Sequence, residues 1–130
     1  MYSKQSVLIV DDDPDFASAV EKILSSAGYE TLLAGSRAEA RELLAKKPAD
    51  LIILDVMMEN YDDGFNLCYE LKHDERFKHI PIIIVTAVTA VTGLKFNPKT
   101  DGEYLEAEEY LEKPIHPEVL LGKVRGLLPT

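Results

Sequence analysis

The chain has 130 residues, 46% hydrophobic and 28% charged, which is ordinary for one globular domain. We therefore expect a single domain over residues 1–130, with a core from about residue 7 to residue 128. The net charge of −9 at pH 7 repels phosphate backbones, so we do not expect direct binding of nucleic acid. Because no apolar run is long enough to span a membrane, we expect a cytoplasmic protein without membrane contact.

Two apolar runs of four residues each end on carboxylates. Residues 7–10 precede Asp11 and Asp12, and residues 51–54 precede Asp55. An uninterrupted apolar run is typical of a strand that is covered on both faces, as in a parallel sheet between two layers of helices. Loops that leave the carboxyl ends of parallel strands meet in a crevice at one edge of the sheet. We therefore expect the three carboxylates to lie together at that edge.

Between these two runs the sequence predicts a helix, a strand and a second helix. Asp13 is a suitable N-cap for a helix whose apolar face begins at Phe16, and Gly28 is suited to end it. Residues 29–34 predict a short strand. The Ser-x-x-Glu pattern at residues 36–39 is a capping box, which indicates a helix that continues to about residue 46.

After Asp55 the sequence predicts a loop over residues 56–64 and a third helix that starts at Gly64. Cys68, the single cysteine, lies among the apolar positions of this helix, so we interpret it as a small core residue. Residues 82–86 form a third β-branched apolar run, which predicts a buried strand. This strand ends on the hydroxyl of Thr86.

The last part of the chain begins irregularly. Residues 87–109 contain turn signals and no convincing helical stripe, whereas residues 110–112 predict a short final strand that leads into Lys113. The pair His116 and Pro117 is suited to start a final helix. This alternation of strands and helices predicts an α/β fold, a doubly wound parallel sheet of five strands with right-handed crossovers.

The strand ends carry a set of residues that suits a metal ion and a phosphoryl group. Carboxylates 4 Å apart repel each other by about 1 kcal/mol per pair in water and about 4 kcal/mol at an effective dielectric of 20. A divalent cation removes this cost, and oxygen ligands without a cluster of His or Cys favour Mg²⁺. Lys113 offsets further negative charge. The candidate residues are Asp11, Asp12, Asp55, Thr86 and Lys113.

With these residues in this order, the chain closely resembles a response-regulator receiver domain of two-component signal transduction, of the chemotaxis-regulator type. The matching segments are residues 7–13, 51–58, 63–64, 84–87 and 110–114. The resemblance implies a flavodoxin-like sheet with strand order 2-1-3-4-5. It also implies a receiver that stands alone or is excised from a longer protein, since we expect no output domain in residues 1–130.

The resemblance assigns the phosphoryl chemistry to Asp55. This carboxylate is expected to take a phosphoryl group from a histidine kinase or a histidine phosphotransfer protein in a Mg²⁺-dependent reaction. Asp12, Asp55 and the backbone carbonyl of Met57 are expected to bind the ion, and Asp11 is expected to act through a metal-bound water. Phosphoryl-transfer sites use such a cation to neutralise the charge of the transferred group.

The resemblance also implies how the phosphoryl group is read. Lys113 is expected to pair with one phosphoryl oxygen and Thr86 to donate a hydrogen bond to another, while Tyr110 moves with Thr86 as part of a switch. The phosphoprotein then controls the binding of a downstream protein partner, which the sequence does not identify. In this interpretation the chain is a signalling switch, which catalyses only its own phosphorylation and dephosphorylation.

One segment departs from the family pattern. The stretch between Thr86 and Lys113 is longer than is usual, and the acidic run before Tyr110 is atypical. We therefore expect residues 89–105 to form an atypical segment in place of a regular fourth helix. Our hypothesis is that this segment reads out phosphorylation or selects the partner.

Two alternatives remain open at this point. The Asp-x-Asp pattern at residues 11–13 also occurs at the start of aspartyl-phosphate hydrolases of the haloacid-dehalogenase type, but that interpretation leaves Asp55 without a role. The second alternative is a pseudo-receiver that is never phosphorylated and serves as a binding module. The presence of Asp55, Thr86 and Lys113 argues against it.

Overall fold

The computed structural model describes residues 5–55, 61–87 and 108–128, with only the backbone described for residues 61–66 and 86–87. The elements in chain order are β1 (Ser6–Val10), α1 (Pro14–Ser26), β2 (Glu30–Ala34), α2 (Arg37–Lys46), β3 (Leu51–Asp55), α3 (Tyr61–Lys72), β4 (Ile82–Ala87), β5 (Glu109–Lys113) and α5 (Pro117–Leu127). The expected atypical segment at residues 89–105 lies outside the described residues, as does Met57.

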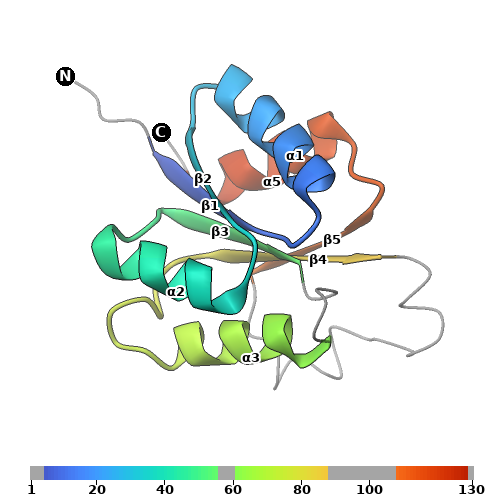
Figure 1. Cartoon of the computed structure of the whole chain (residues 1–130). Coiled ribbons are helices and arrows are strands. Elements are labelled where there is room, and N and C mark those ends of the chain that lie inside the picture. The colour runs from blue at the N-terminus through green and yellow to red at the C-terminus, as the bar shows by residue number, and fades with distance from the viewer. Residues whose placement is uncertain (1–4, 56–60, 88–107, 129–130) are drawn as a thin grey trace.

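The strands form one parallel sheet of five strands in the order β2-β1-β3-β4-β5. Helices α1 and α5 lie on one face of this sheet, and α2 and α3 lie on the other (Figure 1). The predicted fold class, the number of strands and their order are thus confirmed. No helix among the described residues combines the length and apolar character that crossing a membrane requires.

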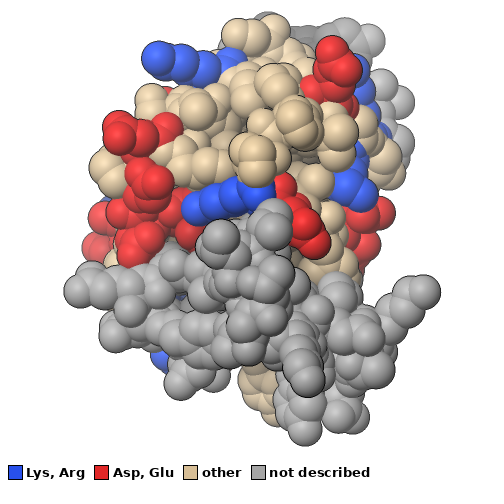
Figure 2. Space-filling model, turned by 90° about the vertical axis from the view of Figure 1, so that its right-hand side faces the viewer, with Lys and Arg blue, Asp and Glu red and all other residues tan. Residues whose placement is uncertain are grey.

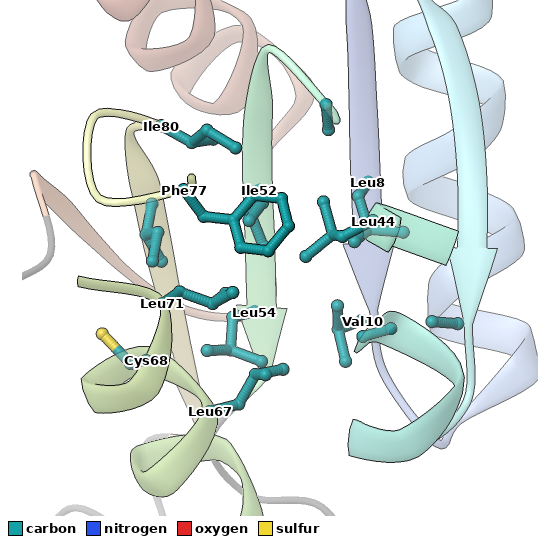
Figure 3. Close-up of a cluster of buried hydrophobic side chains, with 14 of the residues drawn as sticks. Leu8, Val10, Leu44, Ile52, Leu54, Leu67, Cys68, Leu71, Phe77 and Ile80 are labelled. Carbon is teal, nitrogen blue, oxygen red and sulfur yellow. The ribbon is translucent and has the colours of Figure 1, made fainter. Parts of the chain in front are cut away.

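The central strands β1 and β3 each contain an uninterrupted run of four apolar residues, 7–10 and 51–54, because both of their faces are covered. Alternate residues of β1 and β3 enter two separate cores, so Leu8 and Ile52 pack toward α2 and α3, whereas Ile9 and Ile53 pack toward α1 and α5. Figure 3 shows the first of these cores, in which side chains of β1, β3, α2 and α3 meet. Burial of each such side chain contributes about 1.5–3 kcal/mol. The strands that carry the site are therefore firmly held.

The predicted caps of the first two helices are present. The Asp13 carboxylate accepts hydrogen bonds from the backbone N–H groups of Asp15 and Phe16, and α1 is followed by Gly28 at a positive φ of 97°. At α2, the Ser36 hydroxyl accepts from the backbone N–H of Glu39 at 3.1 Å. The Glu39 carboxylate accepts from the N–H of Gly35 rather than of Ser36, so the capping box is shifted by one residue on that side.

Helix α3 begins earlier than the sequence predicts. The expected loop extends to residue 64, but the helix starts at Tyr61 and already includes Gly64. Two acidic residues follow Tyr61, and negative charge in the first helical turn is stabilised by the helix dipole. The polar, turn-like composition of residues 61–64 thus belongs to a helix N-terminus, and the predicted loop boundary is wrong by three residues.

Candidate functional site

The site lies at the carboxyl edge of the sheet. Asp11 directly follows β1, Asp55 is the last residue of β3, and Lys113 is the last residue of β5. Because all strands are parallel, these ends meet at one edge. Figure 2 shows this edge, where acidic side chains gather on both sides of a basic one.

Three carboxylates converge there. Asp11, Asp12 and Asp55 each offer an oxygen, and these oxygens all lie within 4.8 Å of one another. Asp11 and Asp55 are buried, with 4% and 2% of their surface exposed, whereas Asp12 is exposed. The expected convergence of these carboxylates is therefore present. Such proximity is costly without a cation, most of all for the two buried groups.

Asp11 shows this cost most clearly. Its Oδ1 accepts a hydrogen bond from the backbone N–H of Asp13 at 2.8 Å, but its buried Oδ2 accepts none from the described residues. Burial, together with the charge of Asp55, raises the pKa of Asp11 to about 7, although the hydrogen bond from Asp13 and the charge of Lys113 oppose the shift. No described group donates a hydrogen bond to this buried oxygen, and the Lys113 ammonium lies 3.5 Å from it, so the oxygen favours a nearby cation.

Lys113 supplies the positive charge of the site. Its Nζ lies 3.2 Å from Asp55 Oδ2 and 3.5 Å from Asp11 Oδ2, and 24% of the side chain is exposed. Burial lowers the pKa of Lys113, but the two carboxylates outweigh this effect, so the pKa is raised above its usual value. The side chain is therefore an ammonium ion at neutral pH, and it neutralises only part of the acidic cluster.

The residues fit a hard divalent cation. The donor set consists of carboxylate oxygens from Asp11, Asp12 and Asp55, one of them buried without a hydrogen bond. Mg²⁺ favours such oxygen ligands and retains water in its remaining positions. The ends of β1 and β3 hold two of these carboxylates, Asp11 and Asp55, at the carboxyl edge of the sheet.

Two further predicted residues are placed only in part. Thr86 lies near the carboxyl end of β4, where its backbone pairs with Glu112, but its side chain lies outside the described residues. Tyr110 is half-buried against the core beside α3, and burial, followed by the charges of Cys68 and Glu108, raises the pKa of its phenol. The roles of Thr86, Tyr110 and Met57 remain predictions.

The structure also places the single cysteine and the three histidines. Cys68 is fully buried, as expected of a core residue. His73, His79 and His116 are exposed, and His116 is the N-cap residue of α5 without a side-chain capping bond. The peptide bond between Lys113 and Pro114 is cis.

Sequence reasoning missed the contact of one residue with the site. The Lys113 ammonium lies over the ring of Phe16, with Nζ 4.1 Å from the ring centroid. The helical spacing of the apolar residues of α1 assigns Phe16 to the core, and the ring does pack partly against the core formed with α1 and α5. The available signal was its place in the first turn after the Asp residues, which brings the ring beside the carboxyl ends of the strands.

Comparisons with known proteins agree with this geometry. The profile of the family described as response regulator receiver domain matches residues 7–125. The chain is 36% identical over 124 residues to the transcriptional regulatory protein GltR of Pseudomonas aeruginosa, covering 95% of this chain and 49% of that protein. It is 36% identical over 122 residues to the DNA-binding dual master transcriptional regulator RpaA of Synechocystis, covering 94% and 48%. The chain thus spans about half the length of these curated relatives.

Solved structures show the same likeness. A putative response regulator from Chloroflexus aurantiacus superposes with a TM-score of 0.85 at 32% identity, covering 98% of this chain and all of that one. The chemotaxis protein CheY4 of Vibrio cholerae gives a TM-score of 0.82 at 29% identity, covering 96% and 99%. The family match, together with the acidic cluster and its lysine, shows that this chain belongs to the response regulator receiver domains, the signalling switches of two-component systems.

Proposed function

We propose that Asp55 is the phosphoacceptor of this receiver domain. The observation that supports this role is the environment of its carboxylate, which is buried beside the Lys113 ammonium at 3.2 Å and within 4.8 Å of oxygens of Asp11 and Asp12. Asp55 is held at the end of a buried strand, so its carboxylate has a defined position. Cationic neighbours and a metal ion are what a carboxylate needs to approach an anionic phosphoryl group.

The proposed reaction is a phosphoryl transfer from phosphohistidine. A carboxylate oxygen of Asp55 attacks phosphorus, the P–N bond breaks, and its electron pair stays on the imidazole nitrogen of the donor. The products are an acyl phosphate on Asp55 and a histidine that takes up a proton from solvent. Asp11, Asp12, Asp55 and the carbonyl of Met57 would hold Mg²⁺, which when bound offsets the negative charge of the transferred group. Lys113 and Thr86 would contact oxygens of the transferred phosphoryl group.

The proposed output is a change in partner binding. A phosphoryl group adds about 1.5 to 2 negative charges and three acceptor oxygens, so the contacts between Lys113 and the two carboxylates must be rearranged. Lys113 is the last residue of β5, and Tyr110 belongs to the same strand. A rearrangement at Lys113 would therefore be transmitted along β5 to Tyr110 and from there to the surface. We propose a histidine kinase or phosphotransfer protein as the donor and a cytoplasmic location, as is typical of receiver domains.

The expectation that nucleic acid is not a direct partner has no support from these relatives, because their names describe transcriptional and DNA-binding regulators. Only about half of each relative is matched, so a DNA-binding activity of the whole relative is not transferred to this chain.

Labelling with a small phosphodonor tests the proposal. The protein is incubated with acetyl phosphate and Mg²⁺, and its intact mass is measured with time. We expect one phosphoryl adduct on the natural chain, none on Asp55→Asn, and none when EDTA removes the metal. Asp15→Asn is the matched control, because Asp15 is an exposed carboxylate in the first turn of α1. Equal labelling of Asp55→Asn and the natural chain would refute the assignment.

The same preparation separates the hydrolase alternative. An aspartyl-phosphate hydrolase would use Asp11 as its nucleophile, but one oxygen of Asp11 accepts a hydrogen bond from the backbone N–H of Asp13 at 2.8 Å. We expect no turnover of p-nitrophenyl phosphate. Turnover that survives in Asp55→Asn and is lost in Asp11→Asn would favour the hydrolase.

A further inference from the structure

The ring of Phe16 forms one wall around the Lys113 ammonium. Phe16 belongs to the first turn of α1, and the N-cap bonds from its own N–H and that of Asp15 to Asp13 hold this turn in place. The ring also packs partly against the core beneath α1 and α5. Its position is thus determined by contacts that do not involve Lys113. The ring is a fixed surface, over which Nζ lies 4.1 Å from the centroid.

The ammonium is held by three groups from different elements. Two are the carboxylates of Asp55 and Asp11, at 3.2 and 3.5 Å, and the third is the ring. A lysine side chain is flexible and loses considerable rotamer entropy when one position is enforced. A cation and the negative face of an aromatic ring attract each other most strongly when water is partly excluded, as it is here with 24% of the lysine side chain exposed.

These three contacts respond differently when the site is used. In the proposed function both carboxylates take up other partners, since Asp55 binds the phosphoryl group and Asp11 faces the metal. The ring carries no net charge, and neither event occupies it. The attraction between ring and ammonium is therefore the contact that persists while the other two change.

We propose that Phe16 is a positioning residue for phosphoryl transfer, whose ring keeps the Lys113 ammonium over the site after the carboxylates have turned to the cation and the phosphoryl group. This inference rests on the proposed phosphoacceptor role of Asp55. It differs from a packing role, because a packing role depends on the volume of the side chain, whereas this role depends on the aromatic face. Phe16→Leu keeps most of the apolar volume and removes the face, and Phe16→Tyr keeps both.

Ile23 offers a matched control. It lies on the same helix, is half-buried and packs against the same core, but it has no contact with Lys113 among those that the structure describes. Ile23→Ala therefore weakens the packing of α1 without changing the surroundings of the ammonium. A purely structural role for Phe16 predicts that Phe16→Leu and Ile23→Ala behave alike.

The first readout is the position of the lysine in the metal-free protein. A ring face next to Nζ shifts the ε-methylene protons of Lys113 upfield, away from those of the exposed Lys22. We expect this NMR shift in the natural chain, in Phe16→Tyr and in Ile23→Ala, and its loss in Phe16→Leu. A Lys113 signal that is unchanged in Phe16→Leu would overturn the inference without any measurement of activity.

The second readout is the rate of labelling by acetyl phosphate at saturating Mg²⁺. We expect Phe16→Leu to slow labelling about fivefold, equivalent to about 1 kcal/mol, with Phe16→Tyr near the natural rate and Ile23→Ala unaffected. Equal rates in Phe16→Leu and the natural chain would overturn the inference about Phe16 but not the proposed function of Asp55. Absence of label on the natural chain would overturn the proposed function as well. Should Phe16→Leu unfold, Phe16→Met replaces it in both measurements, with the same expected losses.

Discussion

The ammonium of Lys113 lies 3.2 Å from the carboxylate of Asp55, although 58 positions separate the two residues in the sequence. Asp55 ends β3 and Lys113 ends β5, and β4 lies between these strands in the sheet. The ion pair therefore bridges over a strand, at the edge where the loops leave the sheet. A phosphoryl group on Asp55 would come between the carboxylate of Asp55 and the ammonium of Lys113, and would thus separate this ion pair.

Removal of the lysine is expected to destabilise the metal-free protein. Lys113→Met leaves the buried carboxylates of Asp11 and Asp55 without their cation, and we expect a loss of about 1–3 kcal/mol in the free energy of unfolding. Urea denaturation at pH 8 with EDTA measures it. The control is Lys47→Met, which removes an exposed ion pair with Glu30 and should leave the urea midpoint unchanged. Equal midpoints for Lys113→Met and the natural chain would contradict the prediction.

The stability of the metal-free protein is expected to fall as pH rises from about 4 to about 7. Burial raises the pKa of Asp11 from 3.8 to about 7, so in this window the folded protein binds a proton that the unfolded chain has released. Asp11→Asn removes this dependence and should be more stable than the natural chain at pH 8, by about 1–2 kcal/mol. Urea denaturation at pH 5 and pH 8 with EDTA tests this. A natural chain that is more stable at pH 8 than at pH 5 would oppose it.

Added Mg²⁺ is expected to reverse that difference. The cation neutralises the carboxylates of Asp11, Asp12 and Asp55, so it should raise the urea midpoint of the natural chain at pH 8. The rise should be smaller in Asp11→Asn, which lacks one of the charges. An equal rise in both proteins would indicate that Asp11 does not face the ion.

A second ion pair is expected to contribute to stability on the opposite edge of the sheet. Lys72, 5% exposed, donates to the Ile80 carbonyl at 2.9 Å and to Glu108 at 2.8 Å, while Glu108 also accepts from the N–H of Ile82. Glu108→Ala leaves a largely buried ammonium without its anion, so we expect a loss of about 2–3 kcal/mol in urea denaturation. The control is Glu75→Ala, because Glu75 is 87% exposed in its pair with Lys78. Equal effects of the two substitutions would contradict this assignment.

The thiol of Cys68 is expected to react slowly in the folded protein. Its surface is 0% exposed in the core between α3 and the sheet, so a disulfide reagent can reach it only after local or global opening. Reaction with Ellman's reagent should be slow in buffer and fast in urea above the midpoint. Fast reaction in buffer would show that this core opens readily.

The sequence alone was sufficient for most of the fold. The uninterrupted apolar runs before Asp11 and Asp55 indicate strands with both faces covered, and this pattern is local, so it can be read without a structure. The same holds for the Asp13 cap and for Gly28, whose positive φ is a backbone property that few other residues tolerate. The start of α3 was missed because acidic residues suit a helix N-terminus as well as a loop.

The residues of the site could likewise be predicted from the sequence, whereas their geometry could not. Asp11, Asp12, Asp55 and Lys113 were identifiable from the sequence because each stands at the end of a strand, and parallel strands end at one edge. No local pattern records the geometry of the site. The packing of the strands and of α1 on the sheet decides the distances between these groups, the burial of Asp11 Oδ2 and the position of the Phe16 ring over Nζ. Local residue order thus determined which groups meet, whereas tertiary packing decided how closely they meet and which of them water can reach.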